Sequence, residues 1–82
     1  MTLRVLYFAN LRELLGLEQE QLELSRETAT LADLAAALIA RHAELRDQLT
    51  TVRFAVNEEF CQLDARLQSG DVVALIPPVT GG

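Results

Sequence analysis

Hydrophobic residues follow two patterns along this chain, and each pattern predicts one kind of element. Residues 2–9 and 72–76 are almost continuously apolar, which is typical of strands in the middle of a sheet that is covered on both faces. Between these segments, apolar residues recur every three or four positions. That spacing predicts a helix over residues 31–41, with an apolar stripe of Leu31, Leu34, Ala35, Leu38 and Ile39.

Short polar residues mark where the helices should begin. Thr30 is expected to cap the main helix, with Asp33 completing a capping box. Asn10 is expected to cap a short helical turn over residues 11–15, which Gly16 ends. Residues 41–49 fit either an irregular extension of the main helix or a second short helix, and the pattern leaves both open.

The remaining segments predict strands and turns that complete one α+β fold. Alternation over residues 19–25 favours a half-buried edge strand, and residues 52–56 and 60–63 predict two more strands around a turn at 57–59. A turn at 69–71 leads into the last strand. Every apolar stripe is buried if the first and last strands are central and parallel in a mixed sheet. The helix would then cross one face through Leu34, Leu38 and Ile39.

Length and charge limit the classes of function. A chain of 82 residues has room for one domain, and a domain this small encloses few deep pockets. Seven basic residues scattered among twelve acidic ones give a net charge of −5, so we expect no nucleic-acid partner. The longest apolar stretch, residues 34–40, is too short to span a bilayer, so we expect no membrane partner. One cysteine and no signal-peptide pattern indicate a cytoplasmic protein.

Side-chain catalysis finds little support in the sequence. Cys61 has no histidine near it in the sequence and is interpreted as a small, partly buried hydrophobe. His42 is the one histidine, and a zinc site needs about three or four protein ligands at characteristic spacing. His42 is therefore interpreted as a surface residue at a helix C-terminus. Glu58 and Glu59 are adjacent at a turn and are interpreted as solvated rather than as an acid–base pair.

The composition changes only in the last six residues, Pro77-Pro78-Val79-Thr80-Gly81-Gly82. The prolines should stop the last strand and stiffen the chain after it. Glycines have no Cβ and can thread a narrow channel to a partner's active site. We therefore expect a domain over residues 1–78 and a flexible tail over 79–82 that carries an activated carboxylate. A frayed chain end would explain the two glycines equally well.

Four segments together resemble one known family. They are residues 5–13 (VLYFANLRE), residues 55–57 (AVN), the spacing Leu67-x-x-Gly70-Asp71-x-Val73, and the ending PPVTGG. In this order they are similar to the small subunit of molybdopterin synthase over the whole chain. The resemblance implies the ubiquitin-like β-grasp fold, a mixed sheet with one main helix packed across one face.

The resemblance also implies a reaction sequence in which this chain is a carrier and not an enzyme on its own. An E1-like adenylyltransferase would use ATP to adenylate the terminal glycine, and sulfur from a cysteine desulfurase or rhodanese-like protein would replace AMP. The large subunit, with the catalytic pocket, would then transfer the sulfur to cyclic pyranopterin monophosphate to form the molybdopterin dithiolene. Two small and two large subunits would form a heterotetramer, and no metal or cofactor would be bound by this chain.

Carried over residue by residue, the resemblance assigns roles to particular positions. Gly82 would bear the sulfur as a thiocarboxylate, and Arg12 would pair with carboxylates of the partner. The other partner-binding positions would be Phe60, Ile76, Pro77, Pro78, Val79, Thr80 and Gly81.

Two alternatives remain open at the level of sequence. A thiamine-pathway sulfur carrier also ends in Gly-Gly, although such carriers are usually shorter and lack the Pro-Pro-Val neck. A ubiquitin-like interaction module with an inert tail would need neither adenylation nor sulfur. A free, activatable Gly82 separates both carriers from the interaction module.

Overall fold

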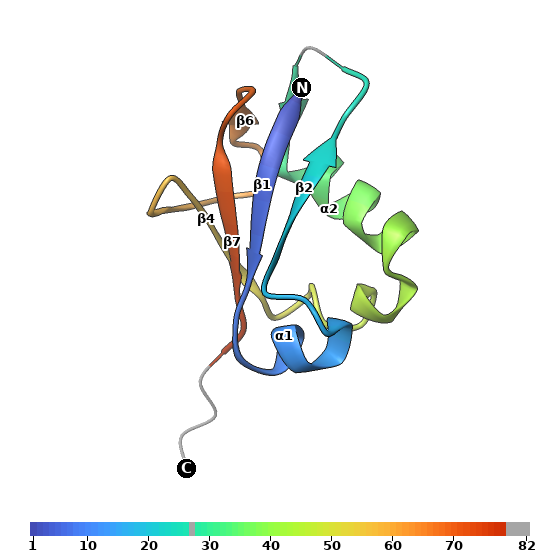
Figure 1. Cartoon of the computed structure of the whole chain (residues 1–82). Helices are drawn as coiled ribbons and strands as arrows, with labels where there is room; N and C mark the ends of the chain where they lie inside the picture. Colours follow the sequence, from blue (N-terminus) through green and yellow to red (C-terminus); the bar gives the residue numbers. More distant parts are fainter. Residues whose placement is uncertain (27, 79–82) are drawn as a thin grey trace.

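The two apolar segments from opposite ends of the chain lie side by side in the centre of one mixed sheet (Figure 1). The computed structural model describes residues 1–26 and 28–78. Strand β1 (Thr2–Tyr7) runs parallel to β7 (Val72–Ile76). Strand β2 (Gln19–Glu23) pairs with β1, and β4 (Arg53–Val56) and β5 (Glu59–Cys61) extend the sheet beyond β7, all antiparallel. The order β2-β1-β7-β4-β5 confirms the predicted central pair.

Helix α2 (Leu31–Arg41) has the bounds that the apolar spacing predicts. The Thr30 hydroxyl accepts a hydrogen bond from the Asp33 N–H, and the Asp33 carboxylate accepts one from the Thr30 N–H, so the capping box is confirmed. Leu31, Leu34 and Leu38 are fully buried. The predicted contact of Ile39 is wrong: Ile39 is half-buried and lies outside the core cluster. Its position is rotated about 100° around the helix from Leu38.

The shorter elements differ from the prediction in their bounds. Helix α1 (Ala9–Leu15) begins before Asn10, and its N-cap residue Phe8 makes no side-chain cap hydrogen bond, so Asn10 is not the cap. Gly16 ends α1 in the left-handed region, at φ +69°, as expected. The chain after α2 forms a short 3-10 helix, η1 (Ala43–Leu45), which answers the open question over residues 41–49.

Two strands of two residues were not predicted at all. Strands β3 (Ala29–Thr30) and β6 (Arg66–Leu67) pair antiparallel in a second, small sheet beside the start of α2. Strand β5 begins and ends earlier than the predicted 60–63, because the turn before it consists of only Asn57 and Glu58.

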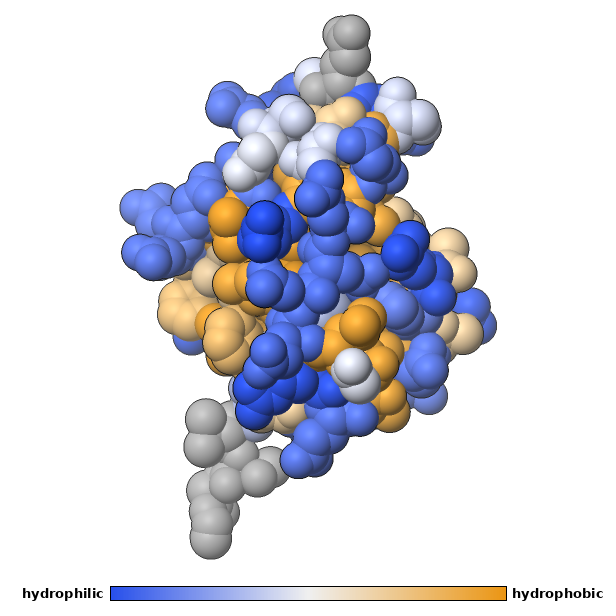
Figure 2. Space-filling model, in the orientation of Figure 1, coloured by the Kyte–Doolittle hydropathy of each residue, from blue (hydrophilic) through white to orange (hydrophobic). Residues whose placement is uncertain are grey.

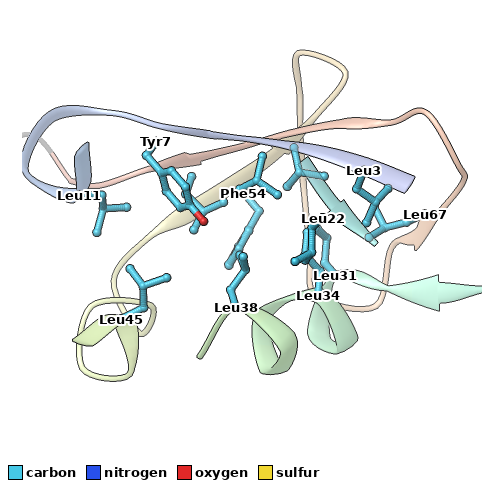
Figure 3. Packing of buried hydrophobic residues seen from close by; sticks show 13 residues of the cluster. Leu3, Tyr7, Leu11, Leu22, Leu31, Leu34, Leu38, Leu45, Phe54 and Leu67 are labelled. Carbon is cyan, nitrogen blue, oxygen red and sulfur yellow. The ribbon is translucent and has the colours of Figure 1, made fainter. Parts of the chain in front are cut away.

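Helix α2 covers one face of the main sheet, as predicted, but the interpretation of the two apolar runs as strands buried on both faces is wrong. Leu3 and Tyr7 point from β1 toward the helix (Figure 3), and both are buried, as is Val5 between them in sequence. The alternate residues of the same apolar run are not buried: Leu6 is half-buried, and Phe8, which follows β1, is 43% exposed. The run therefore supplies a core on one side of the sheet and an apolar surface on the other.

A polar network fixes the hairpin β4–β5 against the start of β7. Asn57 donates from its side-chain amide to Asp71 Oδ1 at 3.0 Å and accepts from the Val72 N–H at 3.0 Å. The second Asp71 oxygen accepts from the Gln68 N–H at 2.8 Å. The Asn57 and Asp71 positions of the family motifs thus have a structural role, because they hold β5 at the edge of the sheet.

Candidate functional site

The uncovered side of the sheet carries a shallow hollow with an apolar lining. We call this surface the apolar face. Its side chains come from four strands and the adjoining chain, because period-two alternation points every second residue away from α2. Figure 2 shows hydrophobic residues reaching the surface between hydrophilic ones on the side of the molecule seen in Figure 1. The apolar residues that line the hollow are Leu6, Phe8, Ala55, Phe60, Val72, Ala74 and Ile76.

The structure brings the two predicted docking residues together on the apolar face. Phe60 is 54% exposed in the middle of β5, and Ile76 is half-buried at the end of β7. A single exposed apolar residue is ordinary, but these two belong to one contiguous apolar surface, and such a surface marks a site where another molecule binds. Phe8 completes the set but was not singled out in the sequence. The signal that could have found it is the alternation along this segment. Val5 and Tyr7 are buried, so Leu6 and Phe8, which alternate with them, point to the opposite face.

The last strand leads from the apolar face directly into the tail. Strand β7 ends at Ile76, as the prolines predicted. Pro77 is buried and Pro78 is exposed, so of the two, Pro78 is the one available to a partner. Val79, Thr80, Gly81 and Gly82, with the predicted flexibility of the tail, lie outside the described residues.

Arg12 lies on α1, at the end of the sheet where β7 finishes (Figure 1). Its side chain is about half exposed, and Nη1 lies 3.4 Å from Glu18 Oε1. Arg12 also lines a small hollow together with Phe8, which places it beside the apolar face. An exposed ion pair of this kind contributes little to stability, so the guanidinium can exchange Glu18 for a carboxylate of a partner.

His42 is not the surface residue that the sequence indicated. Its side chain is 18% exposed, and Nε2 lies 2.6 Å from Glu20 Oε2. The same carboxylate, only 8% exposed, accepts from the Tyr7 hydroxyl at 2.5 Å and from Arg41 Nε at 2.6 Å. We call these four residues the Glu20 cluster. Sequence reasoning missed it because its members come from β1, β2 and the end of α2.

The Glu20 cluster sets two protonation states. Burial alone would raise the pKa of Glu20, but hydrogen bonds from Tyr7, His42 and Arg41 lower it below its ordinary value. Burial, followed by the hydrogen bond to Glu20, raises the pKa of the Tyr7 hydroxyl well above its ordinary value. The ionised Glu20 therefore accepts while Tyr7 stays protonated and donates. All four groups make contacts within the chain, so the cluster joins the edge strand β2 to α2.

The other candidates give no catalytic site. Cys61 is half-buried against the core, as predicted, and its thiol donates to the Glu59 carbonyl at 3.4 Å. Glu58 and Glu59 are exposed. Across residues 1–26 and 28–78, no three histidine, cysteine or acidic side chains are grouped to hold a metal ion. In the same part of the chain, no helix has the length and apolar character needed to cross a membrane.

Comparison with known proteins identifies the family. The ThiS family matches residues 5–82, which is almost the whole chain. The chain belongs to the ThiS family. A *Chlamydomonas reinhardtii* protein named molybdopterin synthase sulfur carrier subunit is 40% identical over 84 residues, covering 100% of both chains. A *Homo sapiens* protein of the same name is 37% identical, over 95% of this chain and 91% of that one. The resemblance that rested on the four segments is confirmed.

Solved structures agree with this member of the ThiS family in fold. A *Pyrococcus furiosus* protein titled putative molybdopterin converting factor, subunit 1, superposes with a TM-score of 0.87 at 32% identity, covering 96% of this chain and 99% of that one. A chain from *Helicobacter pylori*, in a complex of subunits 1 and 2 of molybdopterin-converting factor, gives a TM-score of 0.72 at 28% identity, with full coverage of both. The expected β-grasp fold is confirmed.

Proposed function

We propose that this chain is the sulfur carrier subunit of molybdopterin synthase and that the carboxylate of Gly82 carries the sulfur. The observation that supports this most is the continuity of the exposed apolar face with the strand that leads into Pro77-Pro78-Val79-Thr80-Gly81-Gly82. A partner that covers Phe60 and Ile76 would take the tail from the same side. The Chlamydomonas reinhardtii relative, which is matched over its full length, is named molybdopterin synthase sulfur carrier subunit.

The proposed chemistry takes place at the C-terminal carboxylate. An E1-like adenylyltransferase joins the carboxylate to the AMP of ATP, releasing pyrophosphate, so that the acyl carbon becomes electrophilic. The persulfide of a sulfur donor, such as a cysteine desulfurase or rhodanese-like protein, then displaces AMP and forms an acyl disulfide with Gly82. A second thiol reduces the S–S bond, which leaves a thiocarboxylate on Gly82 and a disulfide between the donor and that thiol. ATP is a substrate of the activating enzyme, so this chain needs no cofactor of its own.

The thiocarboxylate would then be used inside the large synthase subunit. That subunit is proposed to supply the catalytic pocket and to accept the tail, with Val79 to Gly81 as the slim approach to Gly82. Sulfur passes to cyclic pyranopterin monophosphate and the carboxylate is regenerated, once for each sulfur of the molybdopterin dithiolene. Two carriers and two large subunits would form the heterotetramer, in the cytoplasm. The carrier itself contributes binding and the sulfur rather than acid–base groups.

The relatives favour this function over the thiamine-pathway alternative, since both named above are molybdopterin synthase subunits. An experiment distinguishes the sulfur carrier from an interaction module with an inert tail. The two-subunit enzyme is reconstituted and the conversion of cyclic pyranopterin monophosphate to molybdopterin is measured with carrier variants. Deleting Gly82 moves the carboxylate back by about 3.5 Å of extended chain. Misplacing a reacting group by even about 1 Å can cost 100-fold in rate, so activity should be lost.

A second variant tests the chemistry rather than the geometry. Residues added after Gly82 turn its carboxylate into an amide, which cannot be adenylated, so this variant should also be inactive. Cys61→Ser is the matched control and should keep full activity, because the sulfur is carried by Gly82 and not by a thiol. The proposal would be refuted if the extended carrier has full activity while mass spectrometry shows that the extension is still attached.

A further inference from the structure

An arginine is stacked on the exposed phenylalanine of the apolar face. The guanidinium carbon of Arg53 lies 3.8 Å from the centroid of the Phe60 ring. Arg53 is on β4 and Phe60 on β5, in diagonal positions of the antiparallel pair, since Ala55 lies opposite Phe60. Arg53 is also opposite Ile76 on β7. The charge therefore sits between the two docking residues, at the end of the sheet from which the tail leaves.

This arginine differs from others in the chain in what it binds. Arg12, Arg26 and Arg41 each lie within 4 Å of a carboxylate, at Glu18, Asp33 and Glu20. Among the described residues, Arg53 has no such partner, as is also true of Arg4, Arg46 and Arg66. Arg53 is set apart by its contact with the ring face of Phe60. A guanidinium has five N–H donors in a planar fork, and contact with a ring does not use them as hydrogen bonds to oxygen. The donors of Arg53 remain available to a molecule that covers this face.

The surface around Phe60 continues past the apolar face. Phe60 lines the hollow of the apolar face and also a second hollow, which Arg53 and the 51% exposed Leu63 line as well. A partner seated on Phe60 would thus cover Arg53 at the same time. Removing an unpaired guanidinium from water is unfavourable unless a carboxylate meets it.

We propose that Arg53 is a specificity-determining residue that receives a carboxylate of the docked large subunit while it stays stacked on Phe60. The inference rests on the proposed function, because it concerns how that partner is recognised. The geometry suits a carboxylate, whose two oxygens match the guanidinium fork. Glu58 lines the far end of the apolar face, at the turn opposite to Arg53 along the hairpin. The two opposite charges give the face a direction, and a partner with complementary charges can seat in one orientation only.

A purely local role for Arg53 makes a different prediction. If the arginine only shields the Phe60 ring from water, an unbranched apolar side chain of similar length would do the same. Methionine would then leave docking unchanged or make it tighter, since no charge has to be desolvated. If the arginine meets a carboxylate, methionine leaves that carboxylate covered and unpaired.

The test measures the dissociation constant between the carrier and the large subunit by calorimetry, at low and at physiological salt. Arg53→Met should bind at least about tenfold more weakly than the unchanged carrier, and its affinity should depend less on salt. Arg53→Lys, which keeps the charge without the fork, should fall between the two. Arg53→Glu should bind more weakly than Arg53→Met. The matched control is Arg66→Glu, the same change of charge at an exposed position of β6, and it should bind within a few-fold of the unchanged carrier.

The outcomes separate this inference from the proposed function. Arg53→Met binding as tightly as the unchanged carrier, with the same salt dependence, would overturn the role of Arg53 and leave the carrier function intact. Equal losses for Arg53→Glu and Arg66→Glu would also overturn it, because net charge alone would then explain them. Absence of any binding by the unchanged carrier would instead contradict the proposed function. Equal melting temperatures of all the variants establish that the exposed substitutions leave the fold unchanged.

Discussion

At the scale of single residues, the least expected feature is the charged cluster under the end of the sheet. Glu20 is 8% exposed and accepts from three side chains of two other elements. A carboxylate with that many hydrogen bonds is stabilised in its ionised form, although burial opposes it. The cluster could not be predicted from sequence because His42 looks like an ordinary helix-end residue until the fold brings it to Glu20.

The pKa of Glu20 leads to a prediction about acid stability. Because this pKa is lower in the folded chain than its ordinary value of 4.5, the stabilisation is complete above that pH and is lost as the pH falls through the folded-state pKa. Glu20→Gln should lower the free energy of unfolding by about 1–3 kcal/mol at neutral pH. The difference from the unchanged chain should shrink on acidification below the ordinary value. Urea unfolding of the unchanged chain and of Glu20→Gln, at neutral pH and at a pH below 4.5, measures this difference. A difference that grows in acid would contradict this account.

At the scale of elements, the apolar patterns predicted the strands and the main helix, while local polar contacts decided their ends. Leu31, Leu34 and Leu38 lie on one stripe, so periodicity alone indicated the covered side of α2. The bounds of β5 depend on a two-residue turn in which Asn57 has φ +50° and Glu58 φ +73°. The sequence predicted a three-residue turn over 57–59. A two-residue turn needs a positive φ at both residues, and a glutamate rarely adopts one, so nothing in the sequence indicated the shorter turn.

The same turn gives a prediction with a built-in contrast. Glu58→Gly should raise the free energy of unfolding by about 0.5–1 kcal/mol, because glycine takes a positive φ without steric cost. Asn57→Gly relieves the same kind of strain but loses the hydrogen bonds to Asp71 and Val72, so it should instead be destabilising. Denaturant titration of the two variants gives both signs. A loss of stability in Glu58→Gly would show that the turn is not strained.

At the scale of the whole molecule, the tail begins beside the uncovered face of the sheet. Arg53 lies next to the last residue of β7, from which the tail leaves. The sequence motifs located the tail and two of the apolar residues. They did not indicate which residues of the apolar runs face away from the helix, because a run such as Val5-Leu6-Tyr7-Phe8 is apolar at every position. Burial patterns in the structure separate Val5 and Tyr7, which belong to the core, from Leu6 and Phe8.

Docking through this face is tested by placing a charge on it. Phe60→Asp should weaken binding to the large subunit by at least about tenfold, because it puts a desolvated charge where an aromatic anchor was. Its fold should be unchanged, since Phe60 is more than half exposed. Ile76→Asp should weaken binding in the same way. The matched control is Ala36→Asp, at an exposed position of α2 on the covered side of the sheet. Normal binding by both apolar-face variants would mean that the interface lies elsewhere.

The central claim is that the carboxylate of Gly82 becomes a thiocarboxylate. The most direct measurement is the intact mass of the carrier after incubation with ATP, the E1-like enzyme and a sulfur donor, together with fragmentation from the C-terminus. The account predicts a mass gain equal to the replacement of one oxygen by one sulfur, located on Gly82, dependent on ATP and unaffected by Cys61→Ser. A carrier that stays at its original mass with an active enzyme and donor, or a sulfur found on Cys61 instead, would contradict it.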